Sequence, residues 1–348
     1  MLVFFFHFSI LYGGSPEWLT SITRFGWTGV DLFFVLSGFL ITSPLLAIIK
    51  QGEIISLKDF YLRRSFRIIP AYLFTVGIYF LIPAFREKEA LPQLWKFLTF
   101  TQNLGLNIKD NGTFSHAWSL CVEEHFYLLL PVVLLLFQTI RKLSKAYWLI
   151  ITLLLLGLVL RIYSFNQWYL PRMDDSDGYK YWYQYIYYPS YNRLDGLLVG
   201  ITIAGLYQFA PLFWQRITKY GNIIITAGMV VLIGAYYLCI EQDTFFASVF
   251  GFPVVAIGYG LLVVGALSPS GFLFKWNSNI THFIATQSYT IYLTHKGVIH
   301  LTSICCNNFT TSYSIVLISC IFTCTIVAYL LHRLIEQPFI NWRKKICK

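Results

Sequence analysis

Charged residues are scarce in this chain. Only 12% of the 348 residues are Asp, Glu, Lys or Arg, whereas an average soluble domain has about 25%. Apolar residues make up 57% and aromatic residues 19%. A soluble fold with so little charge could not cover its own surface. Composition therefore excludes a cytosolic globular enzyme, a disordered chain and a nucleic-acid-binding domain, and a polytopic membrane protein remains.

Paired cysteine motifs and a cleavable signal are also lacking. The seven cysteines include no CxxC pair. Most of them lie in apolar runs, so we interpret them as small buried apolar residues and expect neither disulfides nor a metal site. The first residues, MLVFFFHFSILYGG, have no basic segment and no small-residue cleavage site. They do not form a signal peptide.

Long apolar runs are what the sequence does contain. A membrane helix needs about 20 mostly apolar residues. We predict an all-α, polytopic integral membrane protein, a bundle of about ten transmembrane helices in a single domain over residues 1–348, with no separate soluble domain. The first run is only about half the required length, so the first span is predicted to be truncated. The runs lie near residues 1–13, 28–49, 70–84, 117–138, 147–165, 186–207, 222–240, 245–267, 286–305 and 313–332.

Lysine and arginine predict the orientation. One set of alternate loops, near residues 50–67, 141–145, 216–219 and 275, together with the tail after residue 332, holds most of the 26 basic residues. Cytoplasmic loops carry such an excess, so this set and both termini are predicted to be cytoplasmic. The chain does not divide into two halves with matching interrupted spans. That pattern is expected of many secondary transporters, so its absence disfavours a transporter.

Ionisable residues inside predicted spans are candidates for function because they are costly there. His7 lies among phenylalanines, and a neutral imidazole can take up and return a proton. The alternative is a packed histidine bonded to a neighbouring carbonyl. Asp31 lies near the outer end of the second run and could hold the tautomer of His7. Alternatively, it is a carboxylate that meets a helix dipole.

Arginines cluster in the stretch KDFYLRRSFRIIP. On a helix, Arg63 and Arg67, or Arg64 and Arg67, share one face. Two guanidinium groups on one face make a forked site for phosphate. The alternative is a cytoplasmic loop that is basic only because of its topology.

Further candidates lie in three later stretches. In HAWSLCVEEHFYLLLP, His116 and Glu123 could act as acid and base or bind a sugar hydroxyl. His116 and His125 are nine residues apart and do not share a helix face well, which disfavours zinc. Arg193 and Asp195 head a span, where a local ion pair is the simpler interpretation. His295 lies among tyrosines that could also be interfacial anchors.

The chain resembles the membrane acyltransferase-3 family, the bacterial O-acyltransferases that modify surface glycans. Seven segments match in the order that the family has them. The segments are FFHF, GWTGVDLFFVLSGFLIT, YLRRSFRIIPAY, HAWSLCVEEHFYLLLP, RLDGLLVG, SYTIYLTHKGV and RLIEQPF.

This resemblance implies a multi-pass protein of the bacterial inner membrane, of about ten helices, with both ends cytoplasmic. It implies transfer of an acyl group, commonly acetyl, from acyl-CoA to a hydroxyl of a cell-surface or lipid-linked carbohydrate. Acyl-CoA would be a co-substrate, with no bound cofactor, no metal and no nucleic acid. The acceptor glycan stays open, with lipopolysaccharide and exopolysaccharide among the candidates.

The resemblance also assigns residues. The functional histidine of the family corresponds to His7, its RxxR motif to Arg64 and Arg67, and its WSLxVE motif begins at Trp118. We therefore expect His7 to act as general base or to accept the acyl group first. The catalytic candidates are His7, Asp31 and Glu123. The candidates for binding acyl-CoA are Arg63, Arg64 and Arg67. The candidates for placing the acceptor are His116, Trp118, Ser119, Arg193, Asp195 and His295.

Two other functions stay open. Polar residues inside a bundle also suit a carrier or flippase that moves a lipid-linked glycan without chemistry. The family places an arginine eleven residues before its histidine, a position that here falls before Met1. An inactive family member is therefore a third hypothesis, although we expect the true start to lie upstream.

Overall fold

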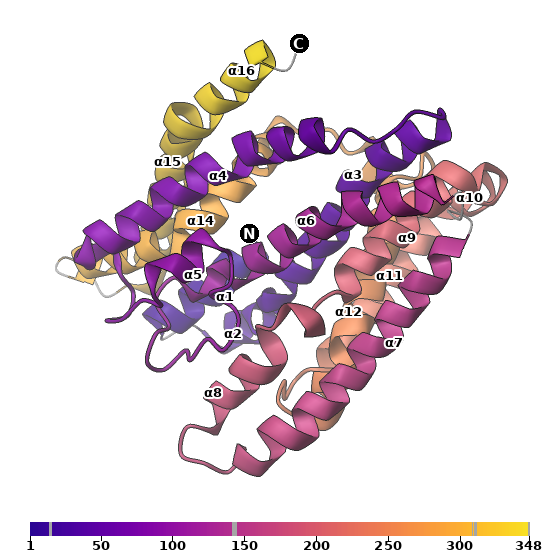
Figure 1. Cartoon of the computed structure of the whole chain (residues 1–348). Helices are drawn as coiled ribbons and strands as arrows, with labels where there is room; N and C mark the ends of the chain where they lie inside the picture. Colours follow the sequence, from indigo (N-terminus) through magenta and orange to yellow (C-terminus); the bar gives the residue numbers. More distant parts are fainter. Residues whose placement is uncertain (14–15, 141–144, 308, 310–311, 347–348) are drawn as a thin grey trace.

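The structure, a computed structural model, describes residues 1–13, 16–140, 145–307, 309 and 312–346. It is a bundle of α-helices (Figure 1), and no strand occurs in these ranges, which confirms the predicted all-α class. The basic residues Arg141, Lys142 and Lys348, and also Cys347, lie outside the described ranges. The long helices are α1 (Leu2–Tyr12), α3 (Gly29–Lys50), α4 (Leu57–Leu81), α6 (Trp118–Thr139), α7 (Ala146–Ser164), α9 (Asp195–Phe209), α11 (Gly221–Leu238), α12 (Phe252–Ala266), α14 (Asn279–Asn307), α15 (Tyr313–Leu331) and α16 (Gln337–Ile346). The short helices are α2 (Glu17–Thr23), α5 (Leu94–Leu98), α8 (Gly178–Trp182), α10 (Pro211–Ile217) and α13 (Phe272–Lys275).

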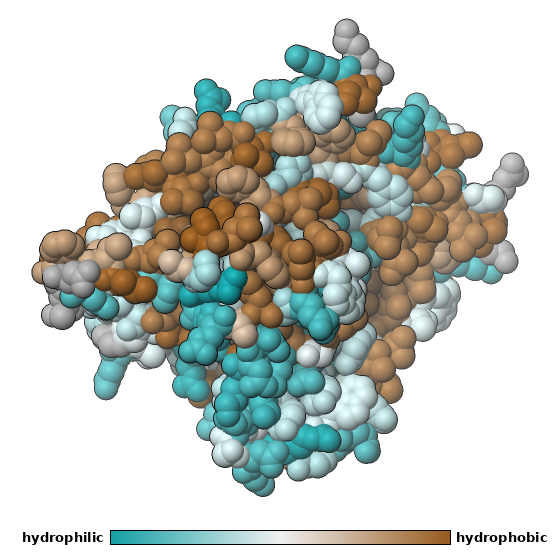
Figure 2. Space-filling view, turned by 60° about the vertical axis from the view of Figure 1, so that its left-hand side comes forward, coloured by the Kyte–Doolittle hydropathy of each residue, from teal (hydrophilic) through white to brown (hydrophobic). Residues whose placement is uncertain are grey.

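Six helical segments of the described chain are long and apolar enough to cross a membrane. Figure 2 shows hydrophobic residues across the middle of one face and hydrophilic residues gathered at its lower end, as a membrane-embedded bundle requires. Each predicted run overlaps one long helix, but the count of ten crossings stays a prediction. The six segments are Glu17–Lys50, Ser115–Thr139, Ala146–Arg172, Pro211–Leu238, Ala247–Ala266 and Tyr313–Ile346.

Two boundaries differ from the prediction for local chemical reasons. Helix α4 begins well before residue 70, because the Ser56 side chain accepts a hydrogen bond from the backbone amide of Asp59 and caps its first turn. Helix α9 begins only at Asp195. Pro189 lacks an amide hydrogen, so an uninterrupted helix cannot run through it. The chain from 183 to 192 is accordingly a π-helical turn, an extended residue and a 3₁₀ turn.

Helices α3 and α9 lie in backbone contact through glycine. A Cβ atom on Gly200 would lie 2.6 Å from the backbone nitrogen of Phe39 and 2.7 Å from the Cα of Gly38. Small residues allow this closeness, which is a common way for membrane helices to pack.

The first helix is short but built into the bundle. Phe4 and Phe8 of α1 are buried, and the Ser9 hydroxyl is 3.0 Å from that of Thr23. A Cβ on Gly26 would lie 2.9 Å from the Cβ of Phe6. With 11 residues, α1 is about 16 Å long, about half of a bilayer core. The packing of α1 fixes its rotation in the bundle, and therefore the direction in which the His7 side chain points.

The cysteines only partly fit the prediction that they are buried. All six in the described ranges are free thiols, so no disulfide forms among them. Cys121, Cys239, Cys320 and Cys324 are buried, whereas Cys305 is exposed and Cys306 is partly exposed. The last two lie in the final turn of α14.

Substitution of Gly200 by alanine should destabilise the bundle. The added methyl group must push two backbones apart, which costs about 1–3 kcal/mol. Gly205 is the matched control on the same helix, because a Cβ there meets nothing within 4 Å. Gly205→Ala should leave stability unchanged or raise it by up to about 1 kcal/mol. Thermal unfolding in detergent measures both, and equal melting temperatures for the two variants would contradict the α3–α9 contact.

Candidate active site

Three histidines from distant parts of the chain lie together in the bundle. His7 of α1 and His295 of α14 are joined by a hydrogen bond of 2.7 Å between His7 Nδ1 and His295 Nε2. His116, in the 3₁₀ turn Ser115–Ala117, has its ring centre 4.7 Å from that of His295 and 5.9 Å from that of His7. The sequence predicted each residue separately but not this cluster.

The hydrogen bonds determine which nitrogen of each neutral ring carries the proton. His295 Nδ1 lies 2.8 Å from the carbonyl oxygen of Tyr292 and 3.2 Å from that of Ile291. Carbonyls only accept, so His295 Nδ1 is protonated and its Nε2 accepts from His7 Nδ1. His7 therefore keeps a lone pair on Nε2, the form that a general base needs. By the same argument His116 donates from Nε2 to the Leu293 carbonyl, 3.3 Å away, and its Nδ1 is buried without a partner.

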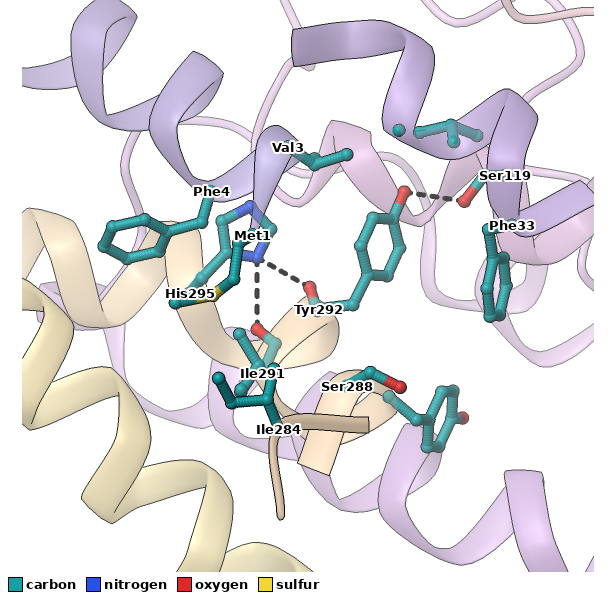
Figure 3. A pocket seen from close by; sticks show the side chains of 13 residues that line it. Met1, Val3, Phe4, Phe33, Ser119, Ile284, Ser288, Ile291, Tyr292 and His295 are labelled. Atoms are coloured by element: carbon teal, nitrogen blue, oxygen red, sulfur yellow. Dashed lines mark hydrogen bonds between the residues drawn. The ribbon is translucent and has the colours of Figure 1, made fainter. Parts of the chain in front are cut away.

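A first cavity of about 130 Å³ lies on one side of this cluster and is mostly apolar. Figure 3 shows His295 and Tyr292 entering it from α14 and Ser119 from α6. The Tyr292 hydroxyl donates to the His116 carbonyl at 2.6 Å and lies 2.6 Å from the Ser119 hydroxyl, which can donate to it. Ser119, a predicted positioning residue, is therefore at the site. Apolar lining residues are Met1, Val3, Phe4, Val30, Phe33, Ile284 and Ile291.

A second cavity, also about 130 Å³, is lined by His7 and His116 and by a ring of aromatic side chains. It shares Val3, Val30 and Tyr292 with the first cavity, so these three residues form the wall between the two. The aromatic lining residues are Phe6, Trp27, Trp118, Tyr183, Tyr187, Tyr188 and Tyr292.

A buried ion pair lies at the edge of the second cavity. The Lys296 ammonium is 2.9 Å from a Glu87 carboxylate oxygen and donates to Ser115 Oγ at 3.1 Å. Burial raises the pKa of Glu87, but the Lys296 charge, its hydrogen bond and backbone amides outweigh burial and hold that pKa below its usual value. Glu87 therefore stays ionised at neutral pH and keeps the ammonium in place.

Sequence reasoning did not propose Glu87, Ser115, Lys296 or Tyr292 as site residues. The sequence does offer a reason to suspect Lys296, because it lies inside the apolar run 286–305, where a lysine is costly in lipid. Glu87 carried none, because it lies in a loop that already has mixed charges.

The prediction that Asp31 holds the His7 imidazole is wrong. One Asp31 oxygen accepts from Arg193 at 2.8 Å, and the other is buried without a hydrogen-bond partner. The Arg193 guanidinium lies over aromatic rings, 3.9 Å from the ring centre of Phe252 and 4.7 Å from that of Tyr187. Asp31 and Arg193 thus neutralise each other inside the protein, and the partner of His7 is another histidine.

A local pair between Arg193 and Asp195 does not form either. Arg161 of α7 binds both carboxylate oxygens of Asp195, at 2.6 and 3.1 Å. All these side chains are buried. The two ion pairs connect α3 to the start of α9 and α7 to α9, so these residues position helices instead of lining either cavity.

The prediction that Glu123 acts together with His116 is also wrong. Glu123 accepts a short hydrogen bond from Ser37, and Ser37 in turn accepts from Tyr127 at 3.3 Å. The lining of neither histidine cavity includes Glu123. His116 lies in the 3₁₀ turn that precedes α6, so the two residues do not follow one helical spacing.

The predicted arginine cluster surrounds a third cavity of about 510 Å³. Arg63, Arg64 and Arg67 lie in α4, as the helical spacing predicted. Arg64 also lies over the Tyr127 ring, 5.3 Å from its centre, which places it close to the Ser37–Glu123 group. No three His, Cys, Asp or Glu side chains in the described chain are placed to hold a metal ion.

Comparison with known proteins agrees with the resemblance. The family described as "Acyltransferase domain" matches residues 1–333, so the chain belongs to this family of acyltransferases. A provisionally named O-acetyltransferase of Staphylococcus aureus strain COL is 31% identical over 96% of this chain and 56% of its own length. The O-acetyltransferase OatA of S. aureus strain NCTC 8325 is 28% identical over 83% of this chain and 48% of its own length. The chain thus spans about half the length of these relatives, and no solved structure matches it significantly.

Removal of Arg193 alone should be more harmful than removal of both members of its ion pair. Arg193→Met leaves a buried unpaired carboxylate on Asp31, which costs about 3–5 kcal/mol. Adding Asp31→Leu removes that charge and should restore much of the lost stability. Thermal unfolding in detergent tests this, and a double variant no more stable than Arg193→Met would contradict the pairing.

Proposed function

We propose that the chain is a membrane O-acyltransferase that moves an acyl group, acetyl foremost, from acyl-CoA to a hydroxyl of a carbohydrate. The observation that carries this proposal is the hydrogen-bonded pair of His7 and His295 where two cavities adjoin. His295 lines the first cavity and His7 the second. A base at such a boundary can serve a donor on one side and an acceptor on the other. Family membership and the names of the relatives support acyl transfer to oxygen.

The chemistry follows from the tautomers of the pair. His7 Nε2 takes the proton of the acceptor hydroxyl as its oxygen attacks the thioester carbonyl carbon. The bond between that carbon and sulfur breaks, and the leaving thiolate takes the proton back from His7. During transfer His7 is a cation, and its Nδ1–H keeps donating a hydrogen bond to His295 Nε2. The Tyr292 and Ile291 carbonyls hold His295 in turn, so the ring of His7 is oriented before substrate arrives.

The donor is assigned to the arginine side. The guanidinium groups of Arg64 and Arg67 suit the phosphates of coenzyme A. Helix α3 lines both the first cavity, at Phe33, and the arginine cavity, at Pro44. The helical rise separates these two residues by about 16 Å. A long extended arm between phosphates and thioester, such as pantetheine, suits that separation.

The acceptor is assigned to the second cavity. Trp118 and its aromatic neighbours offer flat apolar faces, while His116, Glu87 and Lys296 offer hydrogen-bonding groups. Ligand sites of this kind combine an apolar lining with a few fixed polar groups. A sugar ring has apolar C–H faces and polar hydroxyl edges, which matches this lining.

We place the protein in the bacterial inner membrane with the arginine cavity and both termini on the cytoplasmic side. The support is the excess of lysine and arginine in alternate loops. This orientation presents the donor site to the compartment that contains acyl-CoA. We further propose that residues 1–348 act as one transmembrane domain.

Replacement of His7 by alanine should lower acyl transfer by about 10²–10⁴-fold, the usual contribution of a general base. Purified protein with acetyl-CoA and a glycan acceptor, followed by release of free coenzyme A, measures this. His282→Ala is the matched control, because His282 lies on α14 and lines neither histidine cavity. Undiminished transfer by His7→Ala would reject the base, and a wild-type protein without any turnover would favour a carrier or an inactive member.

Substitutions of His295 should distinguish its hydrogen bond to His7 from the space that its side chain fills. Gln offers an oxygen near the place of His295 Nε2 and can accept from His7 Nδ1, whereas Leu cannot. We expect His295→Gln to retain at least about tenfold more kcat than His295→Leu, since one hydrogen bond to a charged group is lost. The KM for acyl-CoA should not change in either variant. Equal kcat values for Gln and Leu would show that His295 does not orient His7.

A further inference from the structure

The arginine cavity has a basic wall that the three predicted arginines do not complete. Arg343, from α16 near the end of the chain, lines it together with Arg63, Arg64 and Arg67 of α4. In the sequence Arg343 belongs to a basic tail, and it lies beyond residue 333, where the family match ends.

Helix α16 is held in place against α4 by aromatic contacts. The Phe66 ring lies edge-on to Trp342, with 5.5 Å between ring centres, and 6.5 Å from the ring centre of Phe339. Trp342 is next to Arg343, so this contact brings the guanidinium to the cavity. Figure 1 shows α16 at the C-terminal end of the chain, at the same end of the bundle as the first turns of α4.

The charge around the cavity is unbalanced. Glu53 and Asp59 also line it, so four guanidinium groups face two carboxylates. Within the part of the chain that the structure describes, Arg63, Arg67 and Arg343 form no ion pair. Unpaired arginines that face one cavity attract an anion. Each guanidinium fork matches one edge of a phosphate, so four of them suit a ligand with more than one phosphate.

We propose that Arg343 binds a phosphate of a nucleotide-bearing acyl carrier, coenzyme A, and that α16 thereby completes the donor site. This rests on the donor in the proposed function and extends it to a residue outside the family match. An anionic lipid headgroup offers the same phosphate chemistry. The cavity favours the coenzyme, because a single headgroup phosphate would leave guanidinium groups without a partner.

The test is the affinity of the full chain for coenzyme A, measured by titration calorimetry in nanodiscs of phosphatidylcholine alone. Arg343→Ala should weaken binding about tenfold, as expected for one charged hydrogen-bonding contact. Arg343→Lys keeps the charge but loses the forked pair of donors. Its affinity for coenzyme A should therefore lie between those of wild type and Arg343→Ala. Lys344→Ala is the matched control, because Lys344 is the next residue on the same helix and does not line the cavity.

The outcomes distinguish this inference from the proposed function. If wild type binds coenzyme A and Arg343→Ala binds it equally well, the inference fails and the donor assignment stands. If Lys344→Ala loses as much affinity as Arg343→Ala, the effect is general charge and the inference also fails. If wild type binds no coenzyme A, the donor assignment itself fails. A parallel titration in nanodiscs with phosphatidylglycerol identifies a lipid site, in which case Arg343→Ala changes lipid binding but not coenzyme affinity.

Discussion

Charged groups in the interior of a membrane bundle must find partners within the protein, because lipid offers none. Among the buried ion pairs that satisfy this constraint are Arg193 with Asp31 and Arg161 with Asp195. Such pairs need not add net stability, since desolvation offsets their attraction. Their effect is geometric, because each pair can form only if α3, α7 and α9 stand in one arrangement. That arrangement also carries α3 past the first cavity and the arginine cavity.

The site itself joins the two ends of the chain. His7 and His295 are 288 residues apart in sequence, yet they share one hydrogen bond. Each histidine has a different support: α1 is fixed by its packing on Gly26, and His295 by the carbonyls of its own helix. A histidine pair differs from the usual histidine–carboxylate pair in charge. Without a carboxylate the pair is neutral at rest, so it can stay in an apolar surrounding without a counterion.

Much of the fold could be predicted from the sequence, because apolar runs and helix propensity are local properties. The late start of α9 was missed although Pro189 signalled it, since an apolar run alone does not reveal where a helix begins. The partners of buried residues could not be predicted in this way. His7 lies in the first apolar run and Asp31 in the second. Whether their side chains meet depends on how each helix is rotated about its axis, which the sequence pattern leaves open. Arg343 was equally hidden, because its place depends on how Phe66 and Trp342 pack.

The wall of Val3, Val30 and Tyr292 brings together one residue from each of three helices, α1, α3 and α14. Each of these side chains lines both cavities. Any substitution that changes the volume of one of them therefore reshapes the two cavities at once, so the spaces on the two sides cannot be enlarged independently at this boundary.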